Sequence, residues 1–325
     1  MTAHPTSTPD KTTAMPVPAW IAADWGTSHL RLWLMDDQNK VMHRILSDRG
    51  MSSLPPADYE PTLLQLLADH LPEKGELATS PIQVVCCGMA GSRQGWAEAQ
   101  YATSPCTPPG ISEATKPRVL DPRLSVYLLP GVKNVAPADV MRGEETQIAG
   151  FLARDARTDT AQVICLPGTH SKWARLENGK ITAFTTFMTG ELFALLQRQS
   201  VLRHCVSEDG WDADTFTTAV EDAITDPVSI AAALFGVRAN ALLSGDGPDI
   251  GRARLSGLLI GAELAATRDY WTNQPVAILG TDTLARHYET ALASQGCQPA
   301  RMDAETLTIA GLCAAYDQLK KSLHP

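Results

Sequence analysis

Residues 21–46 constrain the fold of this chain more than any other stretch. They contain three strand-like segments that follow one another without a helix between them. In the second segment, at 30–35, leucines alternate with other residues, which is the period-2 pattern of a strand. A polar turn at 36–40 precedes the third segment. The stretch therefore predicts a strand–turn–strand unit in the core of a globular α/β protein.

The turn between the first two strands carries side chains that suit phosphate and a metal ion: Asp24, Gly26, Thr27 and Ser28. Gly26 lets backbone N–H groups approach a ligand closely, because it has no Cβ. The Asp24 carboxylate can hold a cation or its waters, and the two hydroxyls can donate to an anion. We therefore expect a phosphate-and-metal site on a β-hairpin instead of on a helix.

A second unit repeats this pattern later in the chain. A buried strand leads into a turn that again offers a glycine and hydrogen-bonding side chains: Gly168, Thr169 and His170. An Asn-Gly hairpin signal at 178–179 precedes the returning strand. The repeat indicates a duplicated domain with pseudo-two-fold symmetry, whose two turns face each other across one cleft. Leu166 stands where the first copy has Asp24, so the metal-facing carboxylate is not duplicated.

His170 allows two interpretations. It is a catalytic base or metal ligand, or it is a histidine that only packs and forms hydrogen bonds. No second His or Cys lies at ligand spacing, which favours the second interpretation. Further along, Thr189 is a candidate N-cap of the next helix.

Three other segments are candidate ligand loops. The loop after a buried strand at 82–87 contains Gly91, Ser92 and Arg93, and open α/β sheets bind ligands at such strand ends. The alternative is an ordinary strand-to-helix connection, but Arg93 is awkward in a merely structural turn. A strand at 276–279 precedes two residues that suit a nucleotide at a helix start, Gly280 and Thr281.

The third segment, 142–147, contains two adjacent acidic residues. Gly143 interrupts the chain, and Glu144 and Glu145 begin a predicted helix, where acidic groups are favoured by the helix dipole. Adjacent helical residues lie about 100° apart, so only one of the two carboxylates can point squarely into a cleft. The sequence does not tell which one does.

The composition excludes several classes of protein. The chain has 325 residues, enough for two domains, and 44% of them are hydrophobic. It carries 27 basic and 36 acidic residues, for a net charge of −9, and no basic run stands out. We therefore expect neither a nucleic-acid nor a membrane partner, although a few local arginines can still bind an anionic substrate. No apolar run approaches the roughly 20 residues of a membrane span.

The cysteines and the N-terminus predict a cytoplasmic protein. Seven cysteines are scattered without CxxC or Cys/His ligand spacing, so we expect reduced thiols. Residues 1–18 are rich in Thr, Pro and Ala, lack a basic-then-apolar signal pattern, and are expected to form a disordered leader. The motifs of P-loop transferases, Rossmann dehydrogenases, serine hydrolases and common zinc enzymes are absent.

Taken together, the two turns and Gly280-Thr281 resemble the two phosphate motifs and the adenosine motif of the sugar kinase/hexokinase/actin superfamily. Six local strings occur in the order found in the 2-dehydro-3-deoxygalactonokinase family, which the chain resembles over residues 20–320: IAADWGTSHLRLWL, GMAGSRQGW, VMRGEETQIAG, LPGTHSKW, TGEL and LSGLLIGAE. Two features depart from the superfamily pattern. The second phosphate motif has Leu166 instead of Asp, and the adenosine motif has Gly-Thr instead of Gly-Gly.

The resemblance implies a duplicated ribonuclease H-like, or actin-like ATPase, α/β fold with the active site in the cleft between two lobes. The lobes are expected at 19–147 and 148–325. The implied reaction is ATP-dependent phosphorylation of the 6-hydroxyl of 2-dehydro-3-deoxy-D-galactonate in D-galactonate breakdown, before an aldolase acts, with ATP and Mg²⁺ as cofactors. The alternatives are a kinase for another 2-keto-3-deoxy sugar acid, or a non-catalytic sensor of the same fold.

The resemblance also implies roles for single residues. Asp24 would bind Mg²⁺, and Glu144 or Glu145 would be the general base. The residues expected to contact ATP are Asp24, Gly26, Thr27, Ser28, Gly168, Thr169, His170, Gly280 and Thr281. The substrate is itself a carboxylate, which a planar bidentate donor binds best. Its expected contacts are Arg93 and Arg142, with Gly91, Ser92, Arg31 and Lys172 behind them. Epimer preference and formation of a homo-oligomer stay open.

Overall fold

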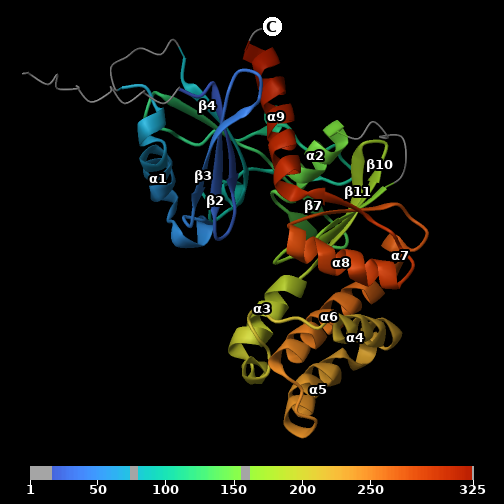
Figure 1. Ribbon diagram of the computed structural model, residues 1–325. Coiled ribbons are helices and arrows are strands. Elements are labelled where there is room, and N and C mark those ends of the chain that lie inside the picture. Colours follow the sequence, from blue (N-terminus) through green and yellow to red (C-terminus); the bar gives the residue numbers. More distant parts are fainter. Residues whose placement is uncertain (1–16, 74–79, 155–161, 324–325) are drawn as a thin grey trace, which may run out of the picture.

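A computed structural model describes residues 17–73, 80–154 and 162–323. All but the last two residues of the leader expected at 1–18 lie outside the described residues. Figure 1 shows a first lobe in blue and cyan, a second lobe in green and red, and a group of helices in yellow and orange at one end. The elements of both lobes are built around one five-stranded sheet each.

The first sheet has the strand order β3-β2-β1-β4-β6. Its members are β1 (Trp20–Trp25), β2 (Leu30–Met35), β3 (Val41–Ser47), β4 (Ile82–Gly88) and β6 (Leu124–Leu128). The first three strands are antiparallel neighbours, and β4 and β6 run parallel to β1. The strand–turn–strand unit predicted at 21–46 is therefore confirmed, and the turn that follows β1 lies at the edge where β4 also ends.

The second sheet repeats this topology in the order β11-β10-β9-β12-β13. Its members are β9 (Gln162–Leu166), β10 (Ser171–Glu177), β11 (Lys180–Phe187), β12 (Val276–Gly280) and β13 (Ala300–Asp303). The pairings are again antiparallel between the first three strands and parallel for β12 and β13. The same order and the same directions in both sheets confirm the predicted duplication and the ribonuclease H-like fold of each lobe.

The last helix, α9 (Ala304–Leu323), connects the two lobes (Figure 1). It contacts β12 and β13 of the second sheet and also β1 and β4 of the first. Tyr316 of α9 stacks on Trp20 of β1, with ring centroids 4.2 Å apart. Helix α2 (Glu144–Arg154) packs closely against α9. The lobe boundary expected at 147/148 stays a prediction, although the chain crosses back over the first sheet well after it.

A small third sheet lies beside the second lobe. It consists of β5 (Tyr101–Thr103), β7 (Gly131–Asn134) and β8 (Asp139–Met141), in the order β5-β7-β8. Val132 and Met141 are buried in a cluster with residues of the second sheet. The sequence pattern does not reveal these strands, because segments of three or four residues are too short to show an alternation. Their importance for the site is that β8 ends directly before Arg142 and Glu144.

The remaining helices pack on one of the two sheets or form the far end of the molecule. They are α1 (Tyr59–Leu66), α3 (Thr189–Gln199), α4 (Ala213–Thr225), α5 (Ile230–Leu243), α6 (Pro248–Ala266), α7 (Arg268–Trp271) and α8 (Asp282–Ser294). Gly257 and Gly261 let α4 approach α6 closely, since a Cβ on either would lie within 2.6 Å of an α4 carbonyl oxygen. No single described helix is long and apolar enough to cross a membrane, and one sharply bent pair, at 213–225 and 227–243, meets that test by length and composition only.

Candidate active site

Two cavities meet at the second phosphate turn. The first, of about 460 Å³, is lined by the turn after β1, by the turn after β9 and by the segment before α2. The second, of about 350 Å³, lies between the turn after β9 and the helices α3, α6 and α8. Gly168 and Thr169 line both. A molecule that extends from the second cavity into the first must therefore pass this turn.

Asp24 lies at the end of β1 and lines the first cavity, as predicted. Its side chain is 15% exposed and accepts a hydrogen bond of 2.7 Å from Nη1 of Arg31 on β2. Burial raises the pKa of Asp24 above its ordinary value, and the Arg31 guanidinium opposes this shift. Gly26 and Thr27 line the same cavity, whereas the exposed Ser28 does not. The first turn thus presents one carboxylate, one hydroxyl and a glycine to a ligand.

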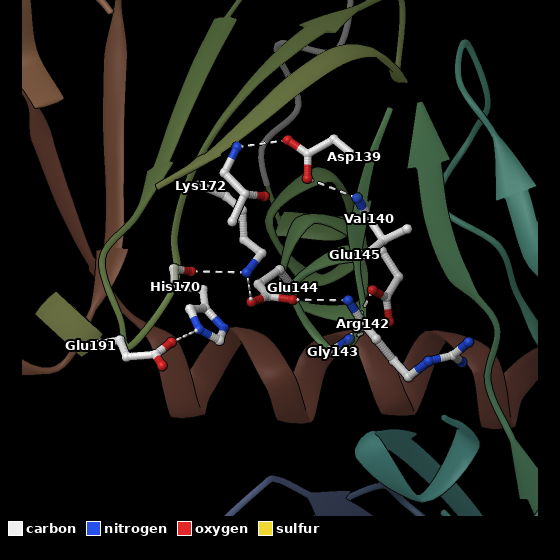
Figure 2. A network of polar contacts seen from close by, with 10 residues as sticks. Asp139, Val140, Arg142, Gly143, Glu144, Glu145, His170, Lys172 and Glu191 are labelled. Carbon is white, nitrogen blue, oxygen red and sulfur yellow. Dashed lines mark hydrogen bonds and ion pairs between the residues drawn. The ribbon is translucent and has the colours of Figure 1, made fainter. Parts of the chain in front are cut away.

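The two acidic residues at the start of α2 lie in different environments. Glu144 lines the first cavity, and its Oε1 lies 2.8 Å from Nζ of Lys172. Its other oxygen accepts a hydrogen bond of 3.0 Å from the backbone N–H of Arg142. Figure 2 shows the Glu144 carboxylate between these two nitrogen atoms, with Glu145 turned to the other side. Glu144 is therefore a charged carboxylate that reaches the cavity.

Glu145 is 1% exposed and does not line the cavity. Both of its oxygens accept from the backbone N–H of Gly143, at 2.8 Å. Burial raises the pKa of Glu145 to about 8, and the neighbouring Glu144 adds to the shift. At neutral pH this side chain is mostly protonated, so it is poorly suited to accept another proton. The positive φ of Gly143, 104°, sets the turn that separates the two acidic side chains.

Lys172 and His170 connect the second turn to α2 and α3. The Lys172 ammonium donates to the backbone oxygen of His170 at 2.8 Å, in addition to its ion pair with Glu144. Its side chain is 7% exposed and lines the first cavity. His170 also lines this cavity, and its Nε2 lies 2.5 Å from a carboxylate oxygen of Glu191 on α3 (Figure 2). Among the described residues no group of three His, Cys, Asp or Glu side chains could hold a metal ion.

Arg142 reaches the same cavity from the loop after β8. It is 9% exposed, and its guanidinium lies over the ring of Tyr101, 4.3 Å from the centroid. One terminal nitrogen donates to the backbone oxygen of Ala99 at 2.8 Å, while the buried Nε has no hydrogen-bond partner in the described structure. Gly91 makes room for this group, since a Cβ there would lie 2.9 Å from Nη1 of Arg142. Gly91 therefore contributes to the site by leaving space for the Arg142 guanidinium.

The loop that suggested Arg93 as a substrate contact is placed differently. Arg93 is exposed and Ser92 is buried, and neither lines the first cavity. The expected contact of Arg93 with the substrate stays a prediction. Its position outside the cavity favours Arg142 for this role. Thr281 lines the second cavity, as the adenosine motif implies, whereas the buried Gly280 lies behind it, where a Cβ would lie 3.2 Å from Cβ of Ala285.

Several residues of the second cavity escape a reading of the sequence. Trp211 and His287 stack with their planes 1° apart and their centroids 3.9 Å apart. The guanidinium of Arg252 lies over Phe193. All four line this cavity, which thereby offers aromatic surfaces and a cation. They belong to different helices and loops without a shared motif, so only the packing of α3, α6 and α8 brings them together.

Comparison with known proteins gives a consistent result. Residues 24–315 match the family described as 2-keto-3-deoxy-galactonokinase. The chain is 38% identical over 307 residues to a probable 2-dehydro-3-deoxygalactonokinase of Rhizobium meliloti, with 91% of this chain and 96% of that protein covered. It is 33% identical over 296 residues to the 2-dehydro-3-deoxygalactonokinase of Escherichia coli, with 90% and 96% covered.

Solved structures agree with these matches. A crystal structure from Sinorhizobium meliloti, provisionally named a 2-dehydro-3-deoxygalactonokinase, has 36% identity and a TM-score of 0.83, with 92% of this chain and 99% of that chain covered. Component A of the (R)-2-hydroxyglutaryl-CoA dehydratase of Acidaminococcus fermentans shares the fold at 11% identity and a TM-score of 0.50, over 93% and 98% of the two chains. The long family match and the high coverage of both relatives show that this chain belongs to the 2-keto-3-deoxy-galactonokinase family, with the two-lobe fold of actin-like ATPases and sugar kinases.

Proposed function

We propose that the protein transfers the γ-phosphoryl group of ATP to the 6-hydroxyl of 2-dehydro-3-deoxy-D-galactonate, in D-galactonate breakdown. The observation that carries this proposal is the meeting of the two cavities at Gly168 and Thr169. The second cavity has the aromatic lining that suits a nucleoside. The first is lined by the carboxylates of Asp24 and Glu144 and by three cationic side chains, Arg31, Arg142 and Lys172, which suits an acceptor that is itself an anion. The names of the relatives supply the substrate class.

In this proposal the residues act mainly by positioning, because phosphoryl transfer asks for alignment and for neutralisation of charge. The turns that contain Thr27 and Thr169 hold the phosphates from opposite walls. Glu144 accepts the proton of the attacking hydroxyl, since of the two acidic residues at the start of α2 it is the one that lines the acceptor cavity. Lys172 holds Glu144 in place and adds positive charge beside the second turn. Closure of the lobes around both substrates would exclude water and limit hydrolysis of ATP.

Asp24 is the residue that would hold Mg²⁺. A single carboxylate on the first turn suits this ion, because Mg²⁺ keeps several waters and is bound by one or two carboxylates plus the phosphates of the substrate. The raised pKa of Asp24 also fits a carboxylate buried for a cation, although Arg31 already compensates part of its charge. When bound, the metal ion neutralises charge on the phosphates. Asp24 and Thr27 then fix the position of the complex on the first turn.

We further propose that Arg142 binds the carboxylate of the sugar acid. Arg142 lines the acceptor cavity, and its buried Nε has no hydrogen-bond partner among the described residues. Arg31 and Lys172 line the same cavity but already pair with Asp24 and Glu144. Arg142 has no ion-pair partner among the described residues, which leaves its charge for the substrate.

Replacing Arg142 tests this assignment. We expect Arg142→Lys to raise the KM for the sugar acid about tenfold or more, because a charge-assisted hydrogen bond is lost, while the KM for ATP stays the same. Steady-state kinetics with each substrate varied in turn measures both values. Arg93→Ala is the matched control, since Arg93 is exposed outside the cavity. A raised sugar-acid KM in Arg93→Ala with a normal value in Arg142→Lys would reverse the assignment of the two arginines.

The function itself is tested by coupled measurement of ADP release with a panel of 2-keto-3-deoxy sugar acids. We expect turnover with the galactonate-derived acid to exceed turnover with its gluconate-derived epimer. Higher turnover with the epimer would identify a kinase for another acid of this class. Binding of sugar acid and ATP without ADP release would identify a sensor, and ADP release that no sugar acid increases would identify a hydrolase.

A cytoplasmic location is part of the same proposal. All seven cysteines are free thiols in the structure, which suits a reducing compartment. Burial raises the pKa values of Cys86 and Cys165, so these thiols are poor nucleophiles.

A further inference from the structure

A buried carboxylate lies directly behind the second phosphate turn. Glu263 on α6 is 2% exposed and accepts four side-chain hydrogen bonds. The donors are the Ser171 hydroxyl at 2.6 Å, the Trp173 indole at 2.7 Å, the Tyr288 hydroxyl at 2.8 Å and the Thr189 hydroxyl. They come from β10, α8 and α3. One side chain therefore joins four elements of the second lobe.

Each of these elements forms part of the nucleotide side of the site. Ser171 directly follows His170 and so fixes the end of the turn. Tyr288 and Thr189 line the second cavity. Thr189 is the first residue of α3, so the N-cap role expected for it is wrong: Met188 takes that position, because the Thr189 hydroxyl donates to Glu263 instead.

The start of α3 in turn contacts the backbone of the second phosphate turn. The backbone N–H of Glu191 donates to the oxygen of Thr169 at 2.9 Å. A Cβ on Gly190 would lie 2.3 Å from the oxygen of Gly168, so α3 and the turn are in direct contact. Any shift of α3 must therefore move the two residues that line both cavities.

A buried carboxylate at this position lowers the stability of the fold compared with an apolar side chain of the same size. Among the described residues Glu263 has no ion-pair partner, and burying an uncompensated charge costs stability. Burial raises the pKa of Glu263, and its four hydrogen bonds oppose the shift. An apolar side chain would fill the space at lower cost, but it would leave three hydroxyls and an indole N–H without their acceptor. The four bonds therefore fix geometry more than they add stability.

We propose that Glu263 is a positioning residue for ATP: it holds the second phosphate turn, the start of α3 and the Tyr288 wall of the nucleotide cavity in one fixed arrangement. This inference rests on the proposed function, because it assigns ATP to the second cavity. It predicts that changes at Glu263 act on ATP and leave the sugar acid almost untouched, since two of its donors, Thr189 and Tyr288, line the second cavity and not the first.

The test is Glu263→Gln, which keeps the shape but replaces one acceptor oxygen by a donor. We expect the kcat/KM for ATP to fall about tenfold or more, because displaced positioning groups cost rate steeply, while the KM for the sugar acid stays within about twofold. Asp222→Asn is the matched control. Asp222 lies on α4 and forms an exposed ion pair with Arg254 of α6, so the change also removes a carboxylate that contacts α6, but outside the nucleotide cavity. A lower melting temperature with unchanged kcat/KM for ATP would overturn the proposal.

A second measurement keeps the proposal testable if Glu263→Gln fails to fold. Tyr288→Phe removes one hydroxyl from the Glu263 carboxylate, and we expect it to weaken binding of a non-hydrolysable ATP analogue about threefold to tenfold in calorimetry. Unchanged affinity for the ATP analogue would contradict the role of Glu263 as a positioning residue. This binding measurement needs no sugar acid, so it stays informative if the proposed acceptor is wrong. An absence of any binding of the ATP analogue to the unmodified protein would instead overturn the proposed function.

Discussion

Glu144→Gln is expected to lower kcat about 10²–10⁴-fold, the usual contribution of a general base. Glutamine keeps the size of the side chain and its acceptor oxygen, but it cannot take the proton of the sugar hydroxyl. Binding should change less than kcat, because the amide oxygen can still accept from one of the two donors that bind Glu144, the backbone N–H of Arg142 or the Lys172 ammonium. Steady-state kinetics at saturating ATP and sugar acid measures the effect, with circular dichroism to show that the variant is folded.

Glu145→Gln is the matched control for this prediction. The Glu145 side chain is buried and mostly protonated at neutral pH, so glutamine nearly reproduces its shape and charge. We expect its kcat to stay within about threefold of the unmodified protein, since volume-conserving changes are tolerated best. A large loss in Glu145→Gln with normal turnover in Glu144→Gln would exchange the two roles. Normal turnover in both variants would remove a general base at this position.

Asp24→Asn is expected to lower Mg²⁺-dependent turnover at least about 10²-fold, comparable to the loss of one dominant electrostatic contact in an active site. Leu166 occupies the equivalent place in the second copy, so the protein has no duplicate carboxylate to replace Asp24. Titration of Mg²⁺ at fixed ATP separates weaker binding of the metal ion, which more Mg²⁺ would overcome, from loss of alignment, which it would not.

The control for Asp24→Asn is Arg31→Gln, which breaks the same ion pair from the other side. We expect Arg31→Gln to keep the Mg²⁺ dependence of the unmodified protein. If both variants lose the same activity, the ion pair supports the fold of the turn, and Asp24 has no separate role toward the metal ion. Equal melting temperatures of the two variants would show that a difference in their activity does not come from a difference in stability.

The fold could be predicted to the extent that it follows local patterns. The two strand–turn–strand units follow from the alternation of apolar and polar residues and from turn residues between the strands, and the structure confirms both units. The return of α9 to the first sheet has no such signal, because the stacking of Tyr316 on Trp20 joins residues almost a whole chain apart. The strands β5, β7 and β8 are missed for a related reason: each is too short for a pattern.

The site shows the same division. The turns with Asp24 and Gly168 could be located from sequence, because a glycine and polar groups after a strand form a local signal. The choice between Glu144 and Glu145 needed the burial of the second side chain, which depends on distant packing. Glu263 lies within α6, and no local pattern marks it, because its four donors come from three other elements.

The position of α9 has a consequence for synthesis of the chain. One face of the first sheet, which includes Trp20 and Trp33, is covered by apolar residues of α9: Leu312, Ala315, Tyr316 and Leu319. The ribosome makes α9 after the strands of both sheets, so this face of the first lobe lacks α9 while the second lobe is being translated. Although domains generally fold as units from the N-terminus, the apolar face of this first lobe is completed only when α9 has been made, so the first lobe reaches its final packing after the second is translated.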